Sequence, residues 1–300
     1  LQIVDFQHKD PSPIVPIQET GKIEKIHQAL VLGIRDYFVK MGFSKAILGL
    51  SGGVDSALVL VLAAEALGAE NVVPVMMPSH FSTDHSVSDS EVLAANLGIN
   101  PLKIPITGIY DSFIAATAAS FAGKPFNVAE ENIQARSRGT LLMALSNKHG
   151  YILLNTSNKS ELAVGYGTLY GDMCGALGVI GDVYKTQIFE LARYINKDGE
   201  IIPENTIVKP PSAELRPDQK DSDSLPDYEI LDRILFEHIE MQQGSNAIIS
   251  KGFDEELVVR ILKMVNRAEF KRYQTPPILR VSPKAFGMGR RMPIVGKYMD

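Results

Sequence analysis

A short run of small and polar residues is the part of this sequence best suited to binding an anion. It reads Ser51-Gly52-Gly53-Val54-Asp55-Ser56 and directly follows an apolar run over 46–50. Adjacent glycines let backbone N–H groups approach an anion without interference from Cβ atoms, and the serine hydroxyls add further donors. A helix is expected to begin at this point, so its positive N-terminal end would face the same anion. The pattern predicts a phosphate-binding turn.

One acidic residue, Asp55, lies inside this predicted anion site. Its carboxylate would repel a phosphate unless a divalent cation lay between them, so its presence predicts Mg²⁺. The alternative is an ordinary strand-to-helix turn, in which Asp55 is a favourable acid in the first helical turn. No GxxxxGK[ST] motif is present, and Gly165-Tyr166-Gly167 and Gly287-Met288-Gly289 are not completed to GxGxxG after a strand. P-loop kinases and Rossmann dehydrogenases are therefore disfavoured.

Alternating strands and helices are expected to position this turn. Strands are predicted near 46–50, 72–77, 102–106, 151–154 and 176–180. Helices are predicted over about 19–40, 54–67, 87–97, 108–120, 128–148, 184–196, 228–241 and 255–270. This alternation predicts an α/β fold with a doubly wound parallel five-stranded sheet and C-terminal helices. The proline-rich, charged segment 205–227 is expected to be a long loop that acts as a lid or is disordered.

Composition narrows the class of protein further. The net charge of −5 shows no basic excess, which argues against a nucleic-acid partner. The single cysteine, Cys174, excludes an intrachain disulfide and CxxC chemistry. No run of about 18 apolar residues is present and the N-terminus lacks a signal sequence, so we expect a cytoplasmic protein with no membrane partner. We expect residues 1–18 to be an extended lead-in and residues 19–300 to form one domain.

Several longer strings, in a fixed order along the chain, point to one family. They are Phe126-Asn127, Glu130-Glu131-Asn132-Ile133-Gln134-Ala135-Arg136, Asn155-Thr156-Ser157-Asn158-Lys159-Ser160-Glu161, Tyr170-Gly171-Asp172, Tyr184-Lys185-Thr186 and Phe270-Lys271-Arg272. Together with the turn at 51–56, they resemble the NAD synthetases of the PP-loop ATP pyrophosphatase superfamily over about residues 20–295. The segments 210–217 and 286–294 resemble the synthetase half of the glutamine-dependent branch. The resemblance implies that ATP, ammonia and nicotinic acid adenine dinucleotide (deamido-NAD) are converted to NAD, AMP and pyrophosphate.

The resemblance also implies roles for individual residues. Asp55 and Glu161 are similar to the carboxylates that hold Mg²⁺ on the departing pyrophosphate, and Asp172 is our candidate for holding ammonia. With Lys185, these form the candidate catalytic set. ATP contacts are implied for Leu50, Ser51, Gly52, Gly53, Val54, Asp55, Ser56, Met77, Thr156, Lys185 and Ser212. Deamido-NAD contacts are implied for Asn132, Arg136, Glu161 and Lys271.

Each of these residues could instead have a purely structural role. Glu161 could be a surface helix acid, and Lys185 and Lys271 could be solvated helix lysines. Asn132 and Arg136, four positions apart on a predicted helix, share one face, where they could address a second nucleotide or form a generic surface pair. Asp172 could be a plain loop acid.

Two other functions remain open at this point. One is another PP-loop amidotransferase of the GMP synthetase type, and the other is a nucleotide-binding regulatory module without turnover. A protein that only binds a nucleotide does not need metal-binding carboxylates from two separate segments, such as Asp55 and Glu161. Their presence therefore favours an enzyme. The resemblance also implies a homodimer and leaves open an upstream glutaminase domain in the native polypeptide. The 300-residue chain itself is expected to use free ammonia rather than glutamine, because Cys174 has no identifiable general base beside it.

Overall fold

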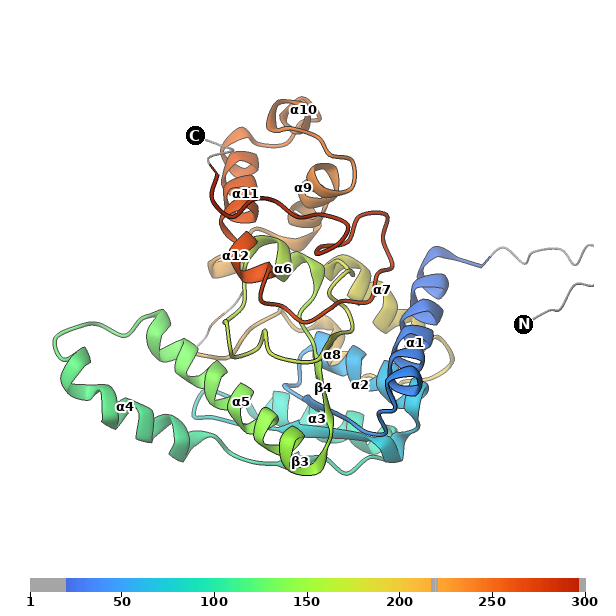
Figure 1. The fold of residues 1–300 in the computed structure, drawn as a ribbon, viewed down its shortest axis with the longest axis vertical. Helices are drawn as coiled ribbons and strands as arrows, with labels where there is room; N and C mark the ends of the chain where they lie inside the picture. The colour runs from blue at the N-terminus through green and yellow to red at the C-terminus, as the bar shows by residue number, and fades with distance from the viewer. Residues whose placement is uncertain (1–19, 217–218, 220, 297–300) are drawn as a thin grey trace, which may run out of the picture.

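The computed structural model describes residues 20–216, 219 and 221–296, so the predicted lead-in over 1–18 lies outside the described residues. The strands are β1 (Ala46–Gly49), β2 (Val72–Met76), β3 (Leu102–Lys103), β4 (Ile152–Asn155) and β5 (Leu177–Gly178). The helices are α1 (Lys22–Met41), α2 (Val54–Leu67), α3 (Asp84–Asn96), α4 (Thr107–Phe121), α5 (Val128–His149), α6 (Lys159–Val164), α7 (Lys185–Ile195), α8 (Glu204–Val208), α9 (Tyr228–Ile239), α10 (Ser245–Ile249), α11 (Glu255–Arg267) and α12 (Glu269–Arg272). Figure 1 shows their arrangement.

The strands form one parallel sheet in the order β3-β2-β1-β4-β5. The chain builds outward from β1 through β2 to β3, and then returns to the other side of β1 for β4 and β5. The strand order therefore reverses between β1 and β4, and ligands of open α/β sheets bind at such a switch point, beyond the carboxyl ends of the strands. The predicted doubly wound five-stranded sheet is confirmed, although β3 and β5 are shorter than expected.

Successive residues of β1 serve opposite faces of the sheet, as the two-residue period of a strand requires. Ala46 and Leu48 belong to the larger core, which α1, α2 and α7 cover. Ile47 belongs to a smaller core on the other face, where Leu142 of α5 packs. Both faces are thus covered, which explains why the strand sequences are apolar throughout rather than alternating.

Two further bodies extend from this sheet. Helices α6, α9, α10 and α11 pack around their own apolar core near the C-terminus. Helices α4 and α5 pack against each other and project to one side as an arm (Figure 1). Only Tyr110 of α4 is buried, so most of this helix is exposed in the single chain.

Three expectations from the sequence need correction. Helix α3 begins at Asp84 rather than near 87, because Thr83 caps its first turn by accepting a hydrogen bond from Ser86 N. The expected long loop over 205–227 starts inside α8, and Thr206 and Ile207 there are buried. The last predicted helix, over about 255–270, ends at Arg267 and is followed by the short helix α12. Within the described residues, no helix combines the length and apolar character needed to cross a membrane.

Candidate functional site

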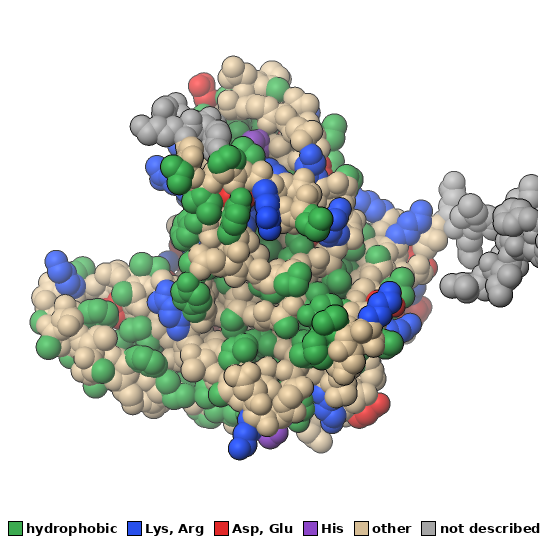
Figure 2. Space-filling model, in the orientation of Figure 1, with side chains coloured by type: hydrophobic (Ala, Val, Ile, Leu, Met, Phe, Trp, Pro, Cys, Tyr) green, Lys and Arg blue, Asp and Glu red, His purple; other side chains and the backbone are tan. Residues whose placement is uncertain are grey.

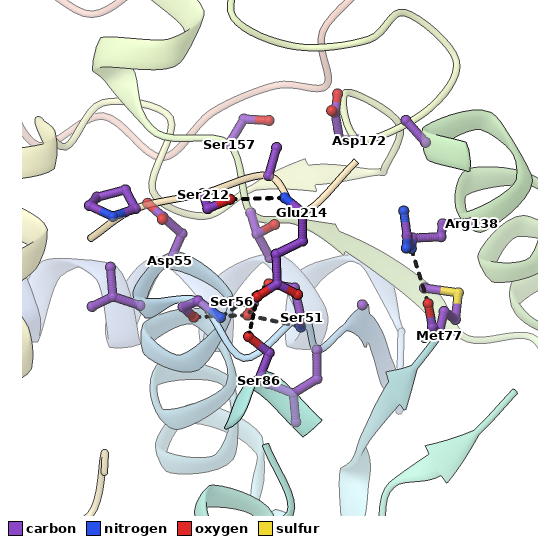
Figure 3. A pocket seen from close by; sticks show the side chains of 18 of the residues that line it. Ser51, Asp55, Ser56, Met77, Ser86, Arg138, Ser157, Asp172, Ser212 and Glu214 are labelled. Carbon is purple, nitrogen blue, oxygen red and sulfur yellow. Dashed lines mark hydrogen bonds between the residues drawn. The ribbon is translucent and has the colours of Figure 1, made fainter. Parts of the chain in front are cut away.

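The predicted phosphate loop, residues 51–56, lies at the switch point between the end of β1 and the start of α2. Gly52 has a φ of 86°, and a Cβ atom there would lie 2.4 Å from the carbonyl oxygen of Ser86, so a larger residue does not fit. The hydroxyls of Ser51 and Ser56 lie 3.1 Å apart (Figure 3). Helix α2 begins without a side-chain cap, which leaves its first N–H groups available to an anion.

Asp55 lies in the first turn of α2 and faces two residues from later in the chain. Lys185, at the start of α7, forms an ion pair with its carboxylate. Asn158 Nδ2 donates to Asp55 Oδ1 at 2.9 Å. Burial lowers the pKa of Lys185, but Asp55 and Glu161 together raise that pKa by more, so the pKa lies above its ordinary value. Lys185 is only 2% exposed and is held as a cation at neutral pH.

Glu161 is placed by local helix chemistry. Asn158 caps α6, and the capping box is completed when Glu161 Oε2 accepts a hydrogen bond from the Asn158 backbone N–H at 3.2 Å. Although Glu161 keeps some contact with water, burial raises its pKa well above the ordinary value, and the charge of Asp55 raises it further. The two carboxylates therefore repel each other, and Lys185 offsets only part of this repulsion.

The start of α6 is fixed by a fully buried lysine. Lys159 Nζ contacts Asp182 at 2.8 Å and Glu240 at 2.5 Å, and it donates to Ser282 Oγ at 2.8 Å. These partners come from the loop after β5, from the end of α9 and from the C-terminal tail. The network ties these segments to α6 and so gives Glu161 a rigid support.

One cavity of about 320 Å³ is lined by the phosphate loop with Asp55, by Glu161 and by Lys185 (Figure 3). Of the residues for which ATP or catalytic roles were predicted, those that line it are Leu50, Ser51, Gly53, Val54, Asp55, Ser56, Met77, Thr156, Glu161, Asp172, Lys185 and Ser212. Gly52 does not line the cavity and instead packs against Ser86. The prediction that these positions gather around one site agrees with the geometry, while their individual roles stay predictions.

The residues predicted to contact deamido-NAD, apart from Glu161, lie outside the cavity lining and surround the loop 165–172. Asn132 Oδ1 accepts a hydrogen bond from the Thr168 hydroxyl at 2.7 Å. Arg136 Nε donates to the carbonyl of Leu169 at 3.2 Å. Lys271 Nζ donates to the carbonyls of Gly165 and Gly167 at 2.8 and 2.7 Å. The predicted second-nucleotide residues thus form a group beside the cavity.

Asp172 belongs to both groups, because its side chain lines the cavity and its Oδ1 accepts a hydrogen bond from Thr168 N at 2.6 Å. The side chain is exposed at the cavity, but the protein atoms near it remove part of its hydration and so raise its pKa to about 6. The carboxylate is open to cavity water, which favours its charged form. Cys174 lies close by, and burial followed by the charge of Asp172 raises the pKa of its thiol to about 11. The thiol is therefore protonated at neutral pH, as expected for a small apolar residue rather than a nucleophile.

Four charged residues of the cavity were missed from the sequence, namely Arg138, Lys209, Glu214 and Asp221. Arg138, two positions after Arg136, donates from Nε to the carbonyl of Met77 at 3.1 Å, and burial lowers its pKa to about 10 (Figure 3). Asp221 accepts hydrogen bonds from the hydroxyls of Tyr166 and Tyr228 at 3.2 and 2.9 Å. Glu214 enters from the segment after α8. The sequence did contain a signal for Arg138. Residues two positions apart on a helix point to different sides, so Arg136 and Arg138 could not both face the same surroundings.

The donor set suits a hard cation such as Mg²⁺. Asp55 and Glu161 offer carboxylate oxygens from α2 and α6, and their mutual repulsion would be relieved by a positive ion between them. Within the described residues, no group of three or more His, Cys, Asp or Glu side chains could hold a metal. Mg²⁺ commonly binds through one or two carboxylates plus water and substrate phosphates, so the pair would need the nucleotide to complete the site.

The fold and this site define a class, the doubly wound α/β proteins that bind a nucleotide at a PP-loop. Residues 26–275 match the family model described as NAD synthase, and the chain belongs to this family. The predicted membership in the NAD synthetase family is confirmed. This family match favours an NAD synthetase over the alternative, an amidotransferase of the GMP synthetase type.

Individual relatives support the same family. A glutamine-dependent NAD(+) synthetase of Synechocystis sp. is 55% identical over 271 residues, covering 90% of this chain and 49% of that protein. The structure of a glutamine-dependent NAD+ synthetase from Acinetobacter baumannii in complex with ADP is 44% identical, with a TM-score of 0.64 over 95% of this chain and 51% of that chain. The structure of an NMN synthetase from Francisella tularensis is 28% identical, with a TM-score of 0.69 over 85% of this chain and 97% of that chain. The chain spans about half the length of the glutamine-dependent relatives.

Proposed function

We propose that this chain catalyses the ATP-dependent amidation of deamido-NAD by ammonia, the last step of NAD biosynthesis. A carboxylate is a poor acyl donor, so the nicotinate carboxylate first attacks the α-phosphorus of ATP and pyrophosphate leaves. Ammonia then attacks the carbonyl of the acyl-adenylate, AMP leaves, and the nitrogen loses a proton. The observation that carries the proposal is the meeting of the phosphate loop, Asp55, Glu161 and Lys185 around one cavity at the switch point.

The residues of the chain would act chiefly by neutralising charge and by positioning. The phosphate loop and Ser212 would bind the phosphates through N–H and O–H donors, with Lys185 as the nearby cation. Asp55 and Glu161 would hold Mg²⁺, which supplies positive charge to the departing pyrophosphate when bound. Asp172, open to the cavity and next to the deamido-NAD group, would hold ammonia near the reacting carbonyl.

A direct assay tests this function. The purified chain, supplied with ATP, Mg²⁺, ammonium and deamido-NAD, is expected to form NAD, AMP and pyrophosphate in equal amounts. Parallel reactions replace deamido-NAD with nicotinic acid mononucleotide, because an NMN synthetase is among the similar structures, and replace ammonium with glutamine. A preference for the mononucleotide would correct the substrate, and the absence of AMP with either substrate would overturn the proposal.

Glutamine is expected to support no reaction by this chain alone. The curated relatives are named glutamine-dependent and are about twice as long, which supports a glutaminase domain as a partner in the whole protein. Within the 300 residues, the single cysteine carries a protonated thiol that is unsuited to attack an amide.

Arg136→Ala is expected to raise the KM for deamido-NAD about tenfold to a hundredfold, the range for loss of a charge-assisted hydrogen bond. The KM for ATP should change little, because Arg136 lies outside the cavity lining. Arg136→Lys should recover part of the loss, since a lysine keeps the charge but not the bidentate fork. Steady-state kinetics with each substrate varied provides the measurement, and the exposed helix residue Arg267 serves as the matched arginine-to-alanine control. An equal rise in both KM values would place Arg136 on the ATP side.

The exposed arm supports a homodimer. Phe113 of α4 is 50% exposed. Val128 and Met143 of α5 are also exposed, as is Phe126 just before this helix. Hydrophobic side chains are visible along this arm in Figure 2. An apolar surface of this kind on a projecting element is typical of a protein interface.

We expect the native chain to have the mass of a dimer in solution, measured by light scattering after size exclusion. Phe113→Asp should shift it toward the monomer by placing a charge in the interface. Phe236→Asp is the matched control, because Phe236 of α9 is similarly exposed, at 41%, but lies away from the arm. A dimer that survives Phe113→Asp would contradict this placement of the interface.

A further inference from the structure

The carboxylate of Glu214 is bound by the N-terminal end of α3, which lies 131 positions earlier in the chain at Thr83. The Thr83 hydroxyl donates to Glu214 Oε1 at 2.9 Å and the Thr83 backbone N–H to Oε2 at 3.3 Å. The Ser86 hydroxyl donates to Oε1 at 2.6 Å (Figure 3). Three donors and the positive end of a helix therefore hold one acceptor carboxylate.

The backbone around Glu214 is shaped to make these bonds. Its φ of 50° lies in the left-handed region, which a residue with a Cβ adopts at a cost and keeps only where its surroundings hold it. Glu214 N donates to Ser212 Oγ at 3.1 Å, and the Ser212 hydroxyl donates to the carbonyl of Gln219 at 2.5 Å, so the turn that carries the carboxylate also fixes the position of the Ser212 side chain. These bonds hold the segment 209–216 where residues 209–215 line the cavity.

Ser86 connects this contact to the phosphate loop. Its carbonyl oxygen lies against Gly52, where a Cβ atom would approach to 2.4 Å. Its hydroxyl donates to Glu214 and also accepts a hydrogen bond from Lys209 Nζ at 3.2 Å. Lys209 is held in addition by an ion pair of 3.1 Å with Asp89 of α3. The start of α3 thus contacts the phosphate loop on one side and the segment 209–216 on the other.

We propose that Glu214 is a positioning residue that latches the segment 209–216 over the nucleotide cavity, so that Ser212 and Lys209 are in place before ATP binds. The proposal rests on the proposed function in taking ATP as the ligand. Without the latch, only a fraction of the molecules would have the segment closed. The apparent dissociation constant for ATP would then equal the intrinsic one divided by that fraction, so binding would be weaker. Once ATP is bound and the segment is closed, the chemical step would be little changed.

Glu214→Ala is expected to weaken ATP binding about tenfold to a hundredfold, the range for loss of hydrogen bonds to a charged acceptor. Calorimetric titration with ATP and Mg²⁺ measures this directly, without any turnover. In kinetics, the KM for ATP should rise similarly, while kcat at saturating ATP stays within about threefold. Glu214→Gln keeps one acceptor oxygen and should give an intermediate loss, and it covers the case in which the alanine variant fails to fold. Glu204→Ala, at an exposed glutamate of α8, is the matched control.

Thr83 allows a second test, because it binds Glu214 but does not line the cavity. Thr83→Asp, which keeps an acceptor to cap α3 but cannot donate to Glu214, should weaken ATP binding in the wild type but add little in the Glu214→Ala background, and Thr83→Ser should keep the wild-type affinity. Additive effects of Thr83→Asp and Glu214→Ala would overturn the latch, as would unchanged ATP affinity in the Glu214 variants.

Hydrogen exchange of the backbone amides in 209–216, measured without nucleotide, separates the latch from the proposed function. Exchange should be faster in Glu214→Ala than in the wild type, and equal exchange would overturn the latch whatever the ligand is. Failure of the wild type to bind ATP, with the difference in exchange still present, would instead overturn the proposed function and leave the latch standing.

Discussion

Asp55→Asn is expected to lower the rate of pyrophosphate release at least about a hundredfold at millimolar Mg²⁺, since one metal carboxylate is worth several kcal/mol of transition-state charge stabilisation. The amide keeps the size of the side chain and its contact with Asn158, but it cannot balance Lys185 or bind a cation strongly. The isotope exchange of pyrophosphate into ATP in the presence of deamido-NAD measures adenylation separately from the attack of ammonia. Excess Mg²⁺ should recover part of the rate.

The matched control for this variant is Asp36→Asn. Asp36 also pairs with a lysine, Lys40, at 2.5 Å, but both side chains are largely exposed on α1. An exposed pair of this kind contributes about 0–1 kcal/mol, so this variant should keep both its rate and its stability. Near wild-type exchange by Asp55→Asn would remove Asp55 from the proposed metal site.

Lys185→Met is expected to destabilise the fold by about 2–4 kcal/mol and to lower the rate of adenylation at least about a hundredfold. Breaking a fully buried ion pair costs about 3–5 kcal/mol, and we expect less here because the Asp55 side chain is 17% exposed to the cavity. Without the lysine, Asp55, Glu161 and Asp221 lose the positive charge that lies nearest to them. Thermal unfolding and pyrophosphate exchange provide the two measurements.

The stability loss of Lys185→Met should depend on pH in a defined direction. The folded-state pKa of Glu161 is raised above its unfolded value, so stability falls as the pH rises from the ordinary pKa of a glutamate through the folded-state pKa. Removing Lys185 raises that pKa further, because the lysine lowers it in the wild type. The difference in melting temperature between wild type and variant should therefore be larger at pH 8 than at pH 5. Lys40→Met, which breaks the exposed pair, should show no such trend, and a pH-independent difference for Lys185→Met would contradict the charge cluster.

Local chemistry allowed much of the fold and part of the site to be predicted from the sequence. The strand at 46–50, the glycine pair and the start of α2 are set within about twenty residues by apolar runs, glycine geometry and helix termini. Asn158 and Glu161 form a capping box three positions apart, so the placement of that carboxylate is also local. The parallel sheet followed from the alternation of these elements. Helix boundaries were less accurate, as α3 shows, because a single cap residue decides them.

Only the tertiary structure decided which side chains meet. Arg136 and Arg138 are two positions apart, and packing of α5 against the sheet directs Arg138 into the cavity while Arg136 contacts the loop 165–172. Glu214 lies in a segment that reads as a loop, and its partners Thr83 and Ser86 are more than a hundred positions away in sequence. Such contacts depend on the crossover that places β4 beside β1 and on the path of the long segment between α8 and α9. No local sequence pattern encodes either of these. The sequence alone therefore determined the types of groups that could carry the chemistry, and the reversal of strand order determined which of them share one cavity.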